Sequence, residues 1–431
     1  MSRATRQLKR CYNIADFREI AKRRLPKGIF EYLDRGSEDE IALVNNRDAF
    51  KRLKLRTKFM VDLTNRDMGV ELFGKRSNLP YIIAPTGIAG LCWYQGEFQL
   101  AKAAAAAGVP FTLATGSITA MEKIAEAGGR VWFQLYMWKD EEQSYQLVKR
   151  AMDNGFEALI VTIDGALGNN REYNRRNGFT IPFTMSARSI TDMLLHPDWL
   201  FGTMFRYIAT TGMPRHENYP PKYQHRITAG AGDRTSGTGG SPMRHQAMTW
   251  KDIQKLRDFW PRKLIVKGIL RPEDAIAAVE CGADGIVVSN HGGRALDAAA
   301  ATIDVLPDIV EAVGGKTTII LDSGVRRGSD MVKALALGAN AVLAGRPTLY
   351  GISTAGQAGA EKALAILKME FEKTMAYCGC RNIAELTPDV FARAGDPVER
   401  TIARLQRQSG GQPGLRPVAA AGNLDKASAG E

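Results

Sequence analysis

Residues 264–294 read LIVKGILRPEDAIAAVECGADGIVVSNHGGR. A short apolar run, Leu264–Val266, comes first, a stretch of helix-forming residues follows at Pro272–Val279, and a second apolar run ends the unit at Ile286–Val288. Two short apolar runs joined by one helix-length connection are typical of a β-α-β unit with parallel strands. This stretch therefore predicts a parallel sheet covered by helices.

The same pattern recurs along most of the chain. Six further apolar runs lie at Tyr81–Ala84, Val109–Leu113, Val131–Leu135, Leu159–Ile163, Thr317–Leu321 and Ala341–Ala344. Helix-forming stretches separate most of them, for example Glu97–Ala107, Glu141–Met152 and Ser329–Leu337. A total of eight runs favours a closed barrel over an open doubly wound sheet, and no G-x-G-x-x-G follows an early strand. We therefore predict an α/β fold, a (β/α)8 TIM barrel.

The barrel occupies only part of the chain. We predict a helical N-terminal segment at 1–75, with Asp16 as a helix N-cap, and the barrel at 76–380. Between Asp164 and Trp250, about 85 residues pass before the next helix, so we expect a long insertion after strand 4, at 165–248, that acts as a lid or contacts a membrane. A C-terminal extension follows at 381–431, and its Gly-, Ala- and Pro-rich composition predicts disorder from about residue 409.

Composition excludes several classes of protein. With 45% hydrophobic and 24% charged residues the chain is not intrinsically disordered, and no apolar run is long enough for a spanning helix. No secretory signal is apparent, and five cysteines without a CxxC pair indicate reduced thiols in a cytosolic compartment. We expect no metal. The net charge of +12 indicates an anionic partner, but no motif supports nucleic acid.

Polar residues follow the predicted strands, where the active sites of such barrels lie. His291 is the sharpest candidate, because the other four histidines all fall in the insertion. A histidine is suited to proton abstraction near neutral pH, and Asp164, after another strand, would orient its ring. Arg171 and Arg294 would bind a carboxylate through their planar guanidinium groups.

The last two strands are followed by a predicted phosphate site. Residues 322–328, DSGVRRG, contain two glycines and two arginines, and Gly345 and Arg346 follow the last strand. Barrels commonly bind phosphate at this place, against backbone amides. Lys267, at the end of the fifth strand, would place a positive charge against an electron-rich ring.

With these residues in place, the chain resembles the FMN-dependent 2-hydroxy-acid oxidases and dehydrogenases over about residues 14–390. The resemblance rests on seven ordered strings: Leu25-Pro26-Lys27 with Tyr32, Ala84-Pro85-Thr86-Gly87, Phe133-Gln134-Leu135-Tyr136, Val266-Lys267-Gly268, Ser289-Asn290-His291-Gly292-Gly293-Arg294, Asp322-Ser323-Gly324 with Arg326, and Gly345-Arg346. Within the family, Leu195-His196-Pro197 and Gly212-Met213-Pro214 most resemble the membrane-associated (S)-mandelate dehydrogenases.

The resemblance implies a role for each site residue. His291 would be the base, paired with Asp164, and Arg171 and Arg294 would bind the substrate carboxylate with Tyr32 and Tyr136 as hydroxyl partners. The flavin ring and ribityl chain of FMN would be lined by Pro85, Thr86, Gly87, Gln134, Thr162, Lys267 and Ser289. The ribityl and phosphate would be held by Asp322, Ser323, Gly324, Val325, Arg326, Gly345 and Arg346. Ala114 departs from the family's usual serine, which would remove one hydrogen bond to the flavin.

The reaction implied is FMN-dependent oxidation of a 2-hydroxy acid, mandelate-like or lactate-like, to the 2-keto acid. Gly87, where family oxidases usually carry alanine, favours a dehydrogenase that passes electrons to a membrane quinone or another non-oxygen acceptor. Aromatic residues of the insertion, such as Trp199, Phe201 and Phe205, predict peripheral membrane contact through 179–222. Small residues at Gly116, Gly165 and Gly168 predict room for an aryl group, hence a preference for mandelate-like acids over glycolate.

Other interpretations remain open at this point. A soluble 2-hydroxy-acid oxidase that produces hydrogen peroxide is the main alternative. Three further alternatives are an FMN barrel that isomerises a diphosphate, a nucleic-acid binder and a flavoprotein without turnover. The isomerase does not explain the spacing of His291 and Arg294. We expect a cytoplasmic homo-oligomer, a tetramer, peripheral on the inner face of the cell membrane.

Overall fold

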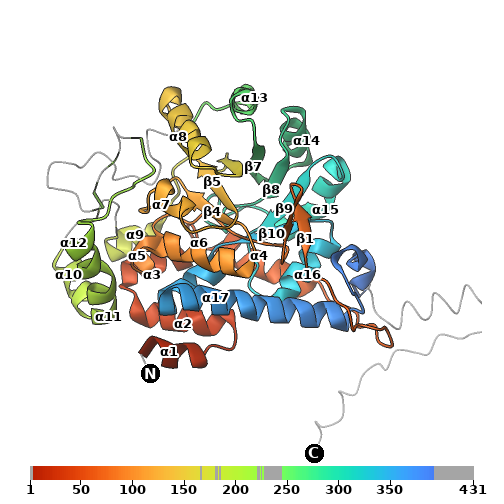
Figure 1. Ribbon diagram of the computed structural model, residues 1–431, viewed down its shortest axis with the longest axis horizontal. Coiled ribbons are helices and arrows are strands. Elements are labelled where there is room, and N and C mark those ends of the chain that lie inside the picture. The colour runs from red at the N-terminus through yellow and green to blue at the C-terminus, as the bar shows by residue number, and fades with distance from the viewer. Residues whose placement is uncertain are drawn as a thin grey trace, which may run out of the picture. The chain divides into compact units, whose positions relative to one another are not determined.

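The centre of the molecule is a closed barrel of eight parallel strands with the order β10-β3-β4-β5-β6-β7-β8-β9 (Figure 1). A computed structural model describes residues 3–165, 167–179, 183, 186–220, 224, 226–227 and 245–392. The strands are β3 (Tyr81–Ile83), β4 (Phe111–Ala114), β5 (Val131–Leu135), β6 (Ala158–Thr162), β7 (Lys263–Ile269), β8 (Gly285–Val288), β9 (Thr318–Asp322) and β10 (Ala341–Ala344). Each lies at a predicted apolar run, so the predicted TIM barrel is confirmed.

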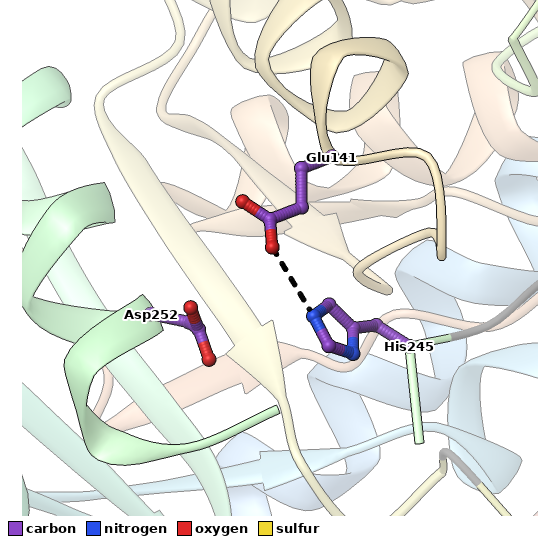
Figure 2. Close-up of side chains that lie close together, drawn as sticks. All are labelled: Glu141, His245 and Asp252. Carbon is purple, nitrogen blue, oxygen red and sulfur yellow. Dashed lines mark hydrogen bonds and ion pairs between the residues drawn. The ribbon is translucent and has the colours of Figure 1, made fainter. Parts of the chain in front are cut away.

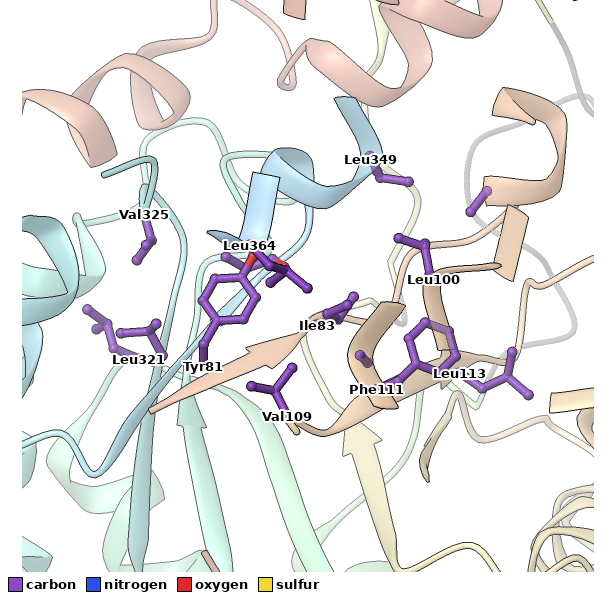
Figure 3. Packing of buried hydrophobic residues seen from close by; sticks show 14 of the residues in the cluster. Tyr81, Ile83, Leu100, Val109, Phe111, Leu113, Leu321, Val325, Leu349 and Leu364 are labelled. Carbon is purple, nitrogen blue, oxygen red and sulfur yellow. The ribbon is translucent and has the colours of Figure 1, made fainter. Parts of the chain in front are cut away.

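The strands are apolar throughout because both of their faces are buried. Alternate side chains point into the barrel and form one cluster, which includes Ile82, Ile160 and Ile265. The others point outward into the larger core beneath the helices. Figure 3 shows part of this outer layer, where Tyr81 and Phe111 pack near Leu100 and Leu364 of two covering helices.

The covering helices follow the predicted pattern. They are α5 (Ala89–Cys92), α6 (Gly96–Ala107), α7 (Met121–Ala125), α8 (Glu141–Asp153), α13 (Trp250–Phe259), α14 (Pro272–Glu280), α15 (Thr302–Val313), α16 (Gly328–Ala336) and α17 (Arg346–Tyr377). Pro272 opens α14 at a position where a missing N–H costs nothing, and Gly108 ends α6 in the left-handed region (φ 66°). Two short 3-10 helices, η3 (Ile383–Glu385) and η4 (Pro388–Val390), follow α17.

The N-terminal segment is helical up to Arg52 and then forms a hairpin. Its helices are α1 (Arg3–Lys9), α2 (Ile14–Arg24), α3 (Lys27–Asp34) and α4 (Ile41–Arg52), and its strands are β1 (Val70–Leu72) and β2 (Lys75–Ser77). Leu72 of the hairpin packs in the cluster inside the barrel, and the ring of Phe73 lies 5.6 Å from that of Trp132. The hairpin therefore extends the barrel core beyond the strands.

One local prediction here was wrong. Asp16 is not the N-cap of α2; Asn13 is, and Asp16 is the third residue of the helix. The Asn13 side chain accepts the Asp16 N–H at 3.1 Å, while the Asp16 carboxylate accepts the Asn13 N–H at 3.1 Å. This reciprocal capping box uses an acidic residue inside the first turn, which sequence patterning misplaced by three positions.

The insertion after β6 contains more regular structure than we expected. Instead of running without a helix to Trp250, it forms α9 (Glu172–Asn177), α10 (Ala187–Leu194), α11 (Pro197–Trp199), the π-helix η1 (Leu200–Phe205) and α12 (Arg206–Thr210), at the left of Figure 1. Two buried side chains attach it to the body: Trp199 Nε1 donates to Leu91 O at 2.6 Å, and Arg24 Nη1 donates to Cys92 O at 2.7 Å while its other nitrogen reaches Thr203 Oγ1 at 3.3 Å.

The end of the insertion is attached to α8 by a small polar cluster (Figure 2). His245 Nε2 lies 3.3 Å from Glu141 Oε1, and Asp252 lies beside them. The three side chains could place ligand atoms within 4.8 Å of one another. However, the ammonium group of Lys255 lies 3.0 Å from Asp252 Oδ1 and 3.7 Å from Glu141 Oε2, so a cation already neutralises the carboxylates. We therefore interpret the cluster as an attachment point.

The described chain forms one compact unit up to Phe391. The disorder predicted from about residue 409 lies outside the described residues, and the boundaries predicted at 75/76 and 380/381 stay predictions. Among the helices described, none combines the length and hydropathy needed to cross a bilayer.

Candidate active site

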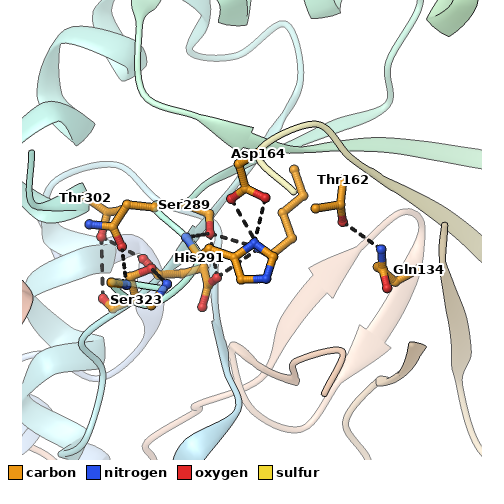
Figure 4. Close-up of polar contacts among 12 residues, drawn as sticks. Gln134, Thr162, Asp164, Ser289, His291, Thr302 and Ser323 are labelled. Atoms are coloured by element: carbon orange, nitrogen blue, oxygen red, sulfur yellow. Dashed lines mark hydrogen bonds and ion pairs between the residues drawn. The ribbon is translucent and has the colours of Figure 1, made fainter. Parts of the chain in front are cut away.

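The structure brings His291 and Asp164 together at the C-terminal mouth of the barrel. His291 follows β8 and Asp164 follows β6, and His291 Nδ1 lies 2.7 Å from Asp164 Oδ1 (Figure 4). His291 has a left-handed backbone (φ 60°), as do Gly292 and Gly293 after it. Such a conformation is costly for a non-glycine residue and persists only where neighbours impose it. Here it turns the imidazole across the mouth toward β6.

The environment keeps this histidine neutral. Burial lowers the pKa of His291, and the charge of Lys267 lowers it further, although Asp164 acts in the opposite direction. Burial alone would raise the pKa of Asp164, but the charge of Lys267 and the interactions with His291, including its hydrogen bond, outweigh burial and lower it. A carboxylate at Nδ1 requires the proton on that nitrogen, so Nε2 carries a free lone pair. His291 is therefore arranged as a base whose ring is oriented by the carboxylate of Asp164.

Lys267 connects the two carboxylates of the mouth. Its Nζ donates to Ser289 Oγ at 3.0 Å and lies 3.4 Å from Asp322 Oδ2 and 3.8 Å from Asp164 Oδ2. Burial alone would lower the pKa of Lys267, but the two carboxylates together raise it. The side chain is therefore a buried, fixed positive charge at the centre of the site.

Two guanidinium groups face the same region as His291. Arg171 and Arg294 lie against the ring of Tyr32, with the guanidinium carbons 5.3 Å and 5.0 Å from the ring centroid. Burial, followed by the like charge of Arg171, lowers the pKa of Arg294 to about 10. Among the described residues, no ion pair with a carboxylate involves either arginine, and the Nε of Arg171 is buried without a partner. Two like charges held this close favour the binding of an anion between them, although Arg294 also donates to the backbone carbonyls of Tyr32 and Arg35.

Tyrosine and amide side chains complete the mouth. Tyr136, after β5, places its hydroxyl 3.4 Å from His291 Nε2. Gln134 Nε2 donates to Thr162 Oγ1 at 3.0 Å, linking β5 to β6. Thr115 Oγ1 in turn donates to the Gln134 backbone carbonyl at 2.5 Å.

The segment after β3 holds Pro85, Thr86 and Gly87, which are all partly exposed at the mouth. A Cβ on Gly87 would lie 3.3 Å from the carbonyl oxygen of Gly116, so the loops after β3 and β4 approach closely. A Cβ on Gly345, after β10, would lie 2.9 Å from Thr86 Cγ2. These glycines let backbone from three strands come together.

The ends of β9 and β10 form a strongly positive recess. Arg346 donates to three backbone carbonyls, those of Leu33, Gly292 and Arg35, and Arg326 donates to Val325 O at 2.7 Å. Burial is the main cause that lowers the pKa of both arginines. No ion pair with a carboxylate is found for either in the described part of the chain. A dianionic phosphate would supply the negative charge that balances these two arginines.

The backbone of the recess is also shaped for close approach. Ser323 and Gly324 have positive φ values of 80° and 88°, and Ser323 Oγ accepts the Gly292 N–H at 2.9 Å. A Cβ on Gly324 would lie 2.5 Å from Asn46 O, so only glycine fits. The residues therefore fit a phosphate bound at strands β9 and β10, with an aromatic ring extending toward Lys267 and Gln134.

Several buried polar residues of the site were missed from the sequence. Asn290 and Asn46 exchange side-chain hydrogen bonds of 2.9 and 2.8 Å, which tie the His291 loop to α4. Asp297 accepts the backbone N–H groups of Asp39 and Ala42, and Thr302 Oγ1 donates to Asp322 O at 2.6 Å. The strand-end position of Asn290 was the only signal available, because its partner lies 244 residues away.

A parallel barrel whose mouth holds a histidine oriented by a carboxylate, two arginines without a carboxylate partner among the described residues and a cluster of further arginines is typical of FMN-binding barrel oxidoreductases. Residues 21–393 match the family model described as FMN-dependent dehydrogenase. The chain belongs to this family, and it is an FMN-dependent enzyme that oxidises a CH–OH group.

Similar proteins agree with this assignment. The chain is 38% identical over 398 residues to (S)-mandelate dehydrogenase of Pseudomonas putida, which covers 91% of this chain and 98% of the relative. It is 38% identical over 379 residues to an L-lactate oxidase of Nostoc, covering 87% of this chain and 96% of that protein. A crystal structure of the monotopic membrane protein (S)-mandelate dehydrogenase superposes with a TM-score of 0.81 at 38% identity, over 89% of this chain and all of that one.

Substituting Asp164→Asn should lower the pKa of His291 further. The carboxylate is the group that favours the charged imidazolium, and its loss leaves burial and Lys267 unopposed. Histidine NMR titration of the purified protein measures this directly. Tyr136→Phe is the control, because it removes a neutral contact and should change the pKa less. A pKa that rises in Asp164→Asn would contradict the proposed charge balance.

Proposed function

We propose that this enzyme oxidises a 2-hydroxy acid, mandelate-like or lactate-like, to the 2-keto acid and passes the electrons to a quinone or another non-oxygen acceptor. The observation that carries the proposal is the placement of a neutral, oriented His291 beside two partly buried guanidinium groups that have no carboxylate partner in the described part of the chain. A base beside a carboxylate site suits a substrate that carries its reacting carbon next to its acid group.

His291 Nε2 accepts the proton that the substrate releases as it loses two electrons. Asp164 accepts the Nδ1 hydrogen bond at 2.7 Å and stabilises the imidazolium that forms. Bound FMN supplies the two-electron acceptor. The proton comes from the hydroxyl group if the electrons leave as hydride, and from C2 if they leave through a carbanion; the same nitrogen serves both routes.

Arg171 and Arg294 bind the substrate carboxylate, and this fixes C2 relative to His291. Each guanidinium offers paired donors that match a carboxylate, and both are held against Tyr32. The hydroxyl groups of Tyr32 and Tyr136 would contact the same substrate, since Tyr136 already lies 3.4 Å from the base.

The resemblance implies the roles of the cofactor residues, and their positions around the mouth support these roles. Pro85, Thr86, Gly87, Gln134, Thr162 and Ser289 would line the ring and ribityl chain, with Lys267 stabilising negative charge on the reduced ring. The phosphate end would be held at Asp322–Arg326 and at Gly345 and Arg346, where the recess supplies uncompensated positive charge.

The loop after β4 supports a large substrate. A Cβ added to Gly116 would meet only one atom of the described residues, the Cα of Gly87 at 3.8 Å, so this glycine leaves room that a side chain could have filled. An aryl substituent on C2 would extend into that space. We therefore propose a preference for mandelate-like acids over glycolate.

Anaerobic addition of mandelate should bleach the flavin absorbance of the holoenzyme. His291→Ala removes the proton acceptor, so its bleaching should slow by about 10²–10⁴-fold while FMN content stays unchanged. His196→Gln, a histidine in the insertion, is the matched control and should bleach at the normal rate. Bleaching of His291→Ala at the wild-type rate, or a higher kcat/KM for glycolate than for mandelate, would overturn the assignment.

The second candidate is a soluble oxidase that forms hydrogen peroxide, and the identity to an L-lactate oxidase supports considering it. Gly87 favours the dehydrogenase. After anaerobic reduction, the flavin should reoxidise faster with a soluble quinone than with air-saturated buffer. Rapid reoxidation in air with stoichiometric peroxide would establish the oxidase instead.

The insertion supports a membrane location for the acceptor. Its exposed apolar patch consists of Leu194, Leu195, Phe201, Phe205 and Ile208, whose exposed fractions are between 49% and 73%. The rings of Phe201 and Phe205 stack at 5.2 Å, so they present one continuous apolar surface. We propose that this patch enters the interface of a bilayer. The cytoplasmic location and the homotetramer stay predictions.

The double substitution Phe201→Asp/Phe205→Asp should abolish sedimentation with phospholipid vesicles, because carboxylates would have to enter the interface. Phe59→Asp is the control, since Phe59 is an equally exposed aromatic side chain outside the insertion. Equal sedimentation of the double variant and the wild type would exclude the patch as the membrane contact.

A further inference from the structure

Positive charge is concentrated at the start of the chain, away from the active site. Residues 3–27 carry nine lysines and arginines against two acidic residues, a net +7 out of +12 for the whole protein. A flavin phosphate and a substrate carboxylate at the barrel mouth do not account for this charge. Some other anion is therefore expected at α1 and α2.

These helices and the insertion line a cavity of about 590 Å³, with four arginines and three carboxylates on its wall. Arg6 and Arg10 from the α1 region, Arg23 from α2 and Asp198 from α11 line it. Figure 1 draws α1, α2 and α11 at the same corner of the molecule. The cavity therefore joins the N-terminal helices to the segment that carries the apolar patch.

The arginines of the cavity are available to a ligand. Arg6, Arg10 and Arg23 are exposed, and none of the ion pairs in the described part of the chain involves them. Two carboxylates of the cavity wall have partners of their own: Asp16 accepts the Tyr12 N–H at 2.7 Å, and Glu19 lies 2.9 Å from Arg18. Only Arg24, buried against the Trp93 ring at 4.3 Å, is committed to the structure.

One residue of the cavity wall is close in sequence to the apolar patch. Asp198, at its wall, falls between Leu195 and Phe201, which are 73% and 63% exposed. An anionic bilayer is bound where apolar side chains enter the interface and cations on the same element or its neighbours meet the headgroups.

We propose that Arg6, Arg10 and Arg23 form a binding site for the phosphate of an anionic phospholipid headgroup, in the cavity between α1, α2 and α11. The inference rests on the membrane contact proposed for the apolar patch. The two elements have separate tasks: the patch gives affinity for any bilayer, and the arginines select negatively charged lipid. The bilayer, rather than a soluble phosphate ester, is the partner, because the site adjoins the patch.

The test compares sedimentation of the full-length holoenzyme with two kinds of vesicle, phosphatidylcholine alone and phosphatidylcholine mixed with phosphatidylglycerol, at low salt. Wild type should bind the anionic vesicles more tightly. In the variant Arg6→Gln/Arg10→Gln/Arg23→Gln, the ratio of the affinity for anionic vesicles to the affinity for neutral vesicles should fall by about fivefold for each charge removed. Binding to the neutral vesicles, FMN content and turnover with a soluble acceptor should not change.

A matched control removes the same charge elsewhere. Lys51→Gln/Lys149→Gln/Arg271→Gln neutralises three cations whose side chains are 65–72% exposed, and it should keep the anionic gain. An equal loss in this control would show that net charge alone acts and would overturn the site. Displacement from anionic vesicles by micromolar glycerol 3-phosphate would also overturn it, in favour of a soluble ligand.

The outcomes separate the two proposals. If wild type binds both kinds of vesicle equally, the headgroup site is wrong and the membrane contact stands. If wild type binds neither, the membrane contact itself is wrong.

Discussion

The ammonium group of Lys267 is the interaction on which the mouth of the barrel depends. It lies between Asp164 and Asp322, and without it two carboxylates would be buried close together with no fixed countercharge. Asp164 orients the histidine, while Asp322 accepts the Ser289 hydroxyl at 2.7 Å beside the phosphate recess. The positive charge of Lys267 thus stabilises both the carboxylate that orients the base and the carboxylate beside the phosphate recess.

The base itself is held at the expense of backbone strain. Three consecutive positive φ values, from His291 to Gly293, are stabilised by contacts on every side: Ser289 Oγ accepts the His291 N–H, and Asn290 Oδ1 accepts the Gly293 N–H. Gly293 allows α4 to approach, since a Cβ there would lie 2.5 Å from the Leu43 nitrogen. The N-terminal helices therefore belong to the active site as much as the barrel strands do.

Local sequence signals predicted the barrel and the convergence at its mouth, because parallel closure sends the residue after every strand to one end. This argument placed His291 and Asp164 together, although they are 127 residues apart. It could not find Glu97, which is fully buried and binds Thr119 Oγ1 and the Ile118 N–H, nor the pairing of Asn46 with Asn290. Those contacts depend on how helices pack on the barrel, which periodicity does not encode. The short helices of the insertion were missed for the same reason.

The insertion is fastened to the body by Trp199, which donates to the Leu91 carbonyl of α5, and by Arg24 of α2, which donates to the Asp198 carbonyl and reaches the Thr203 hydroxyl. Backbone carbonyls are present whatever the residue type. An element that docks in this way can be acquired, lost or exchanged during evolution without compensating changes in the catalytic framework. Relatives with the same reaction centre are thereby free to diverge in where in the cell they work.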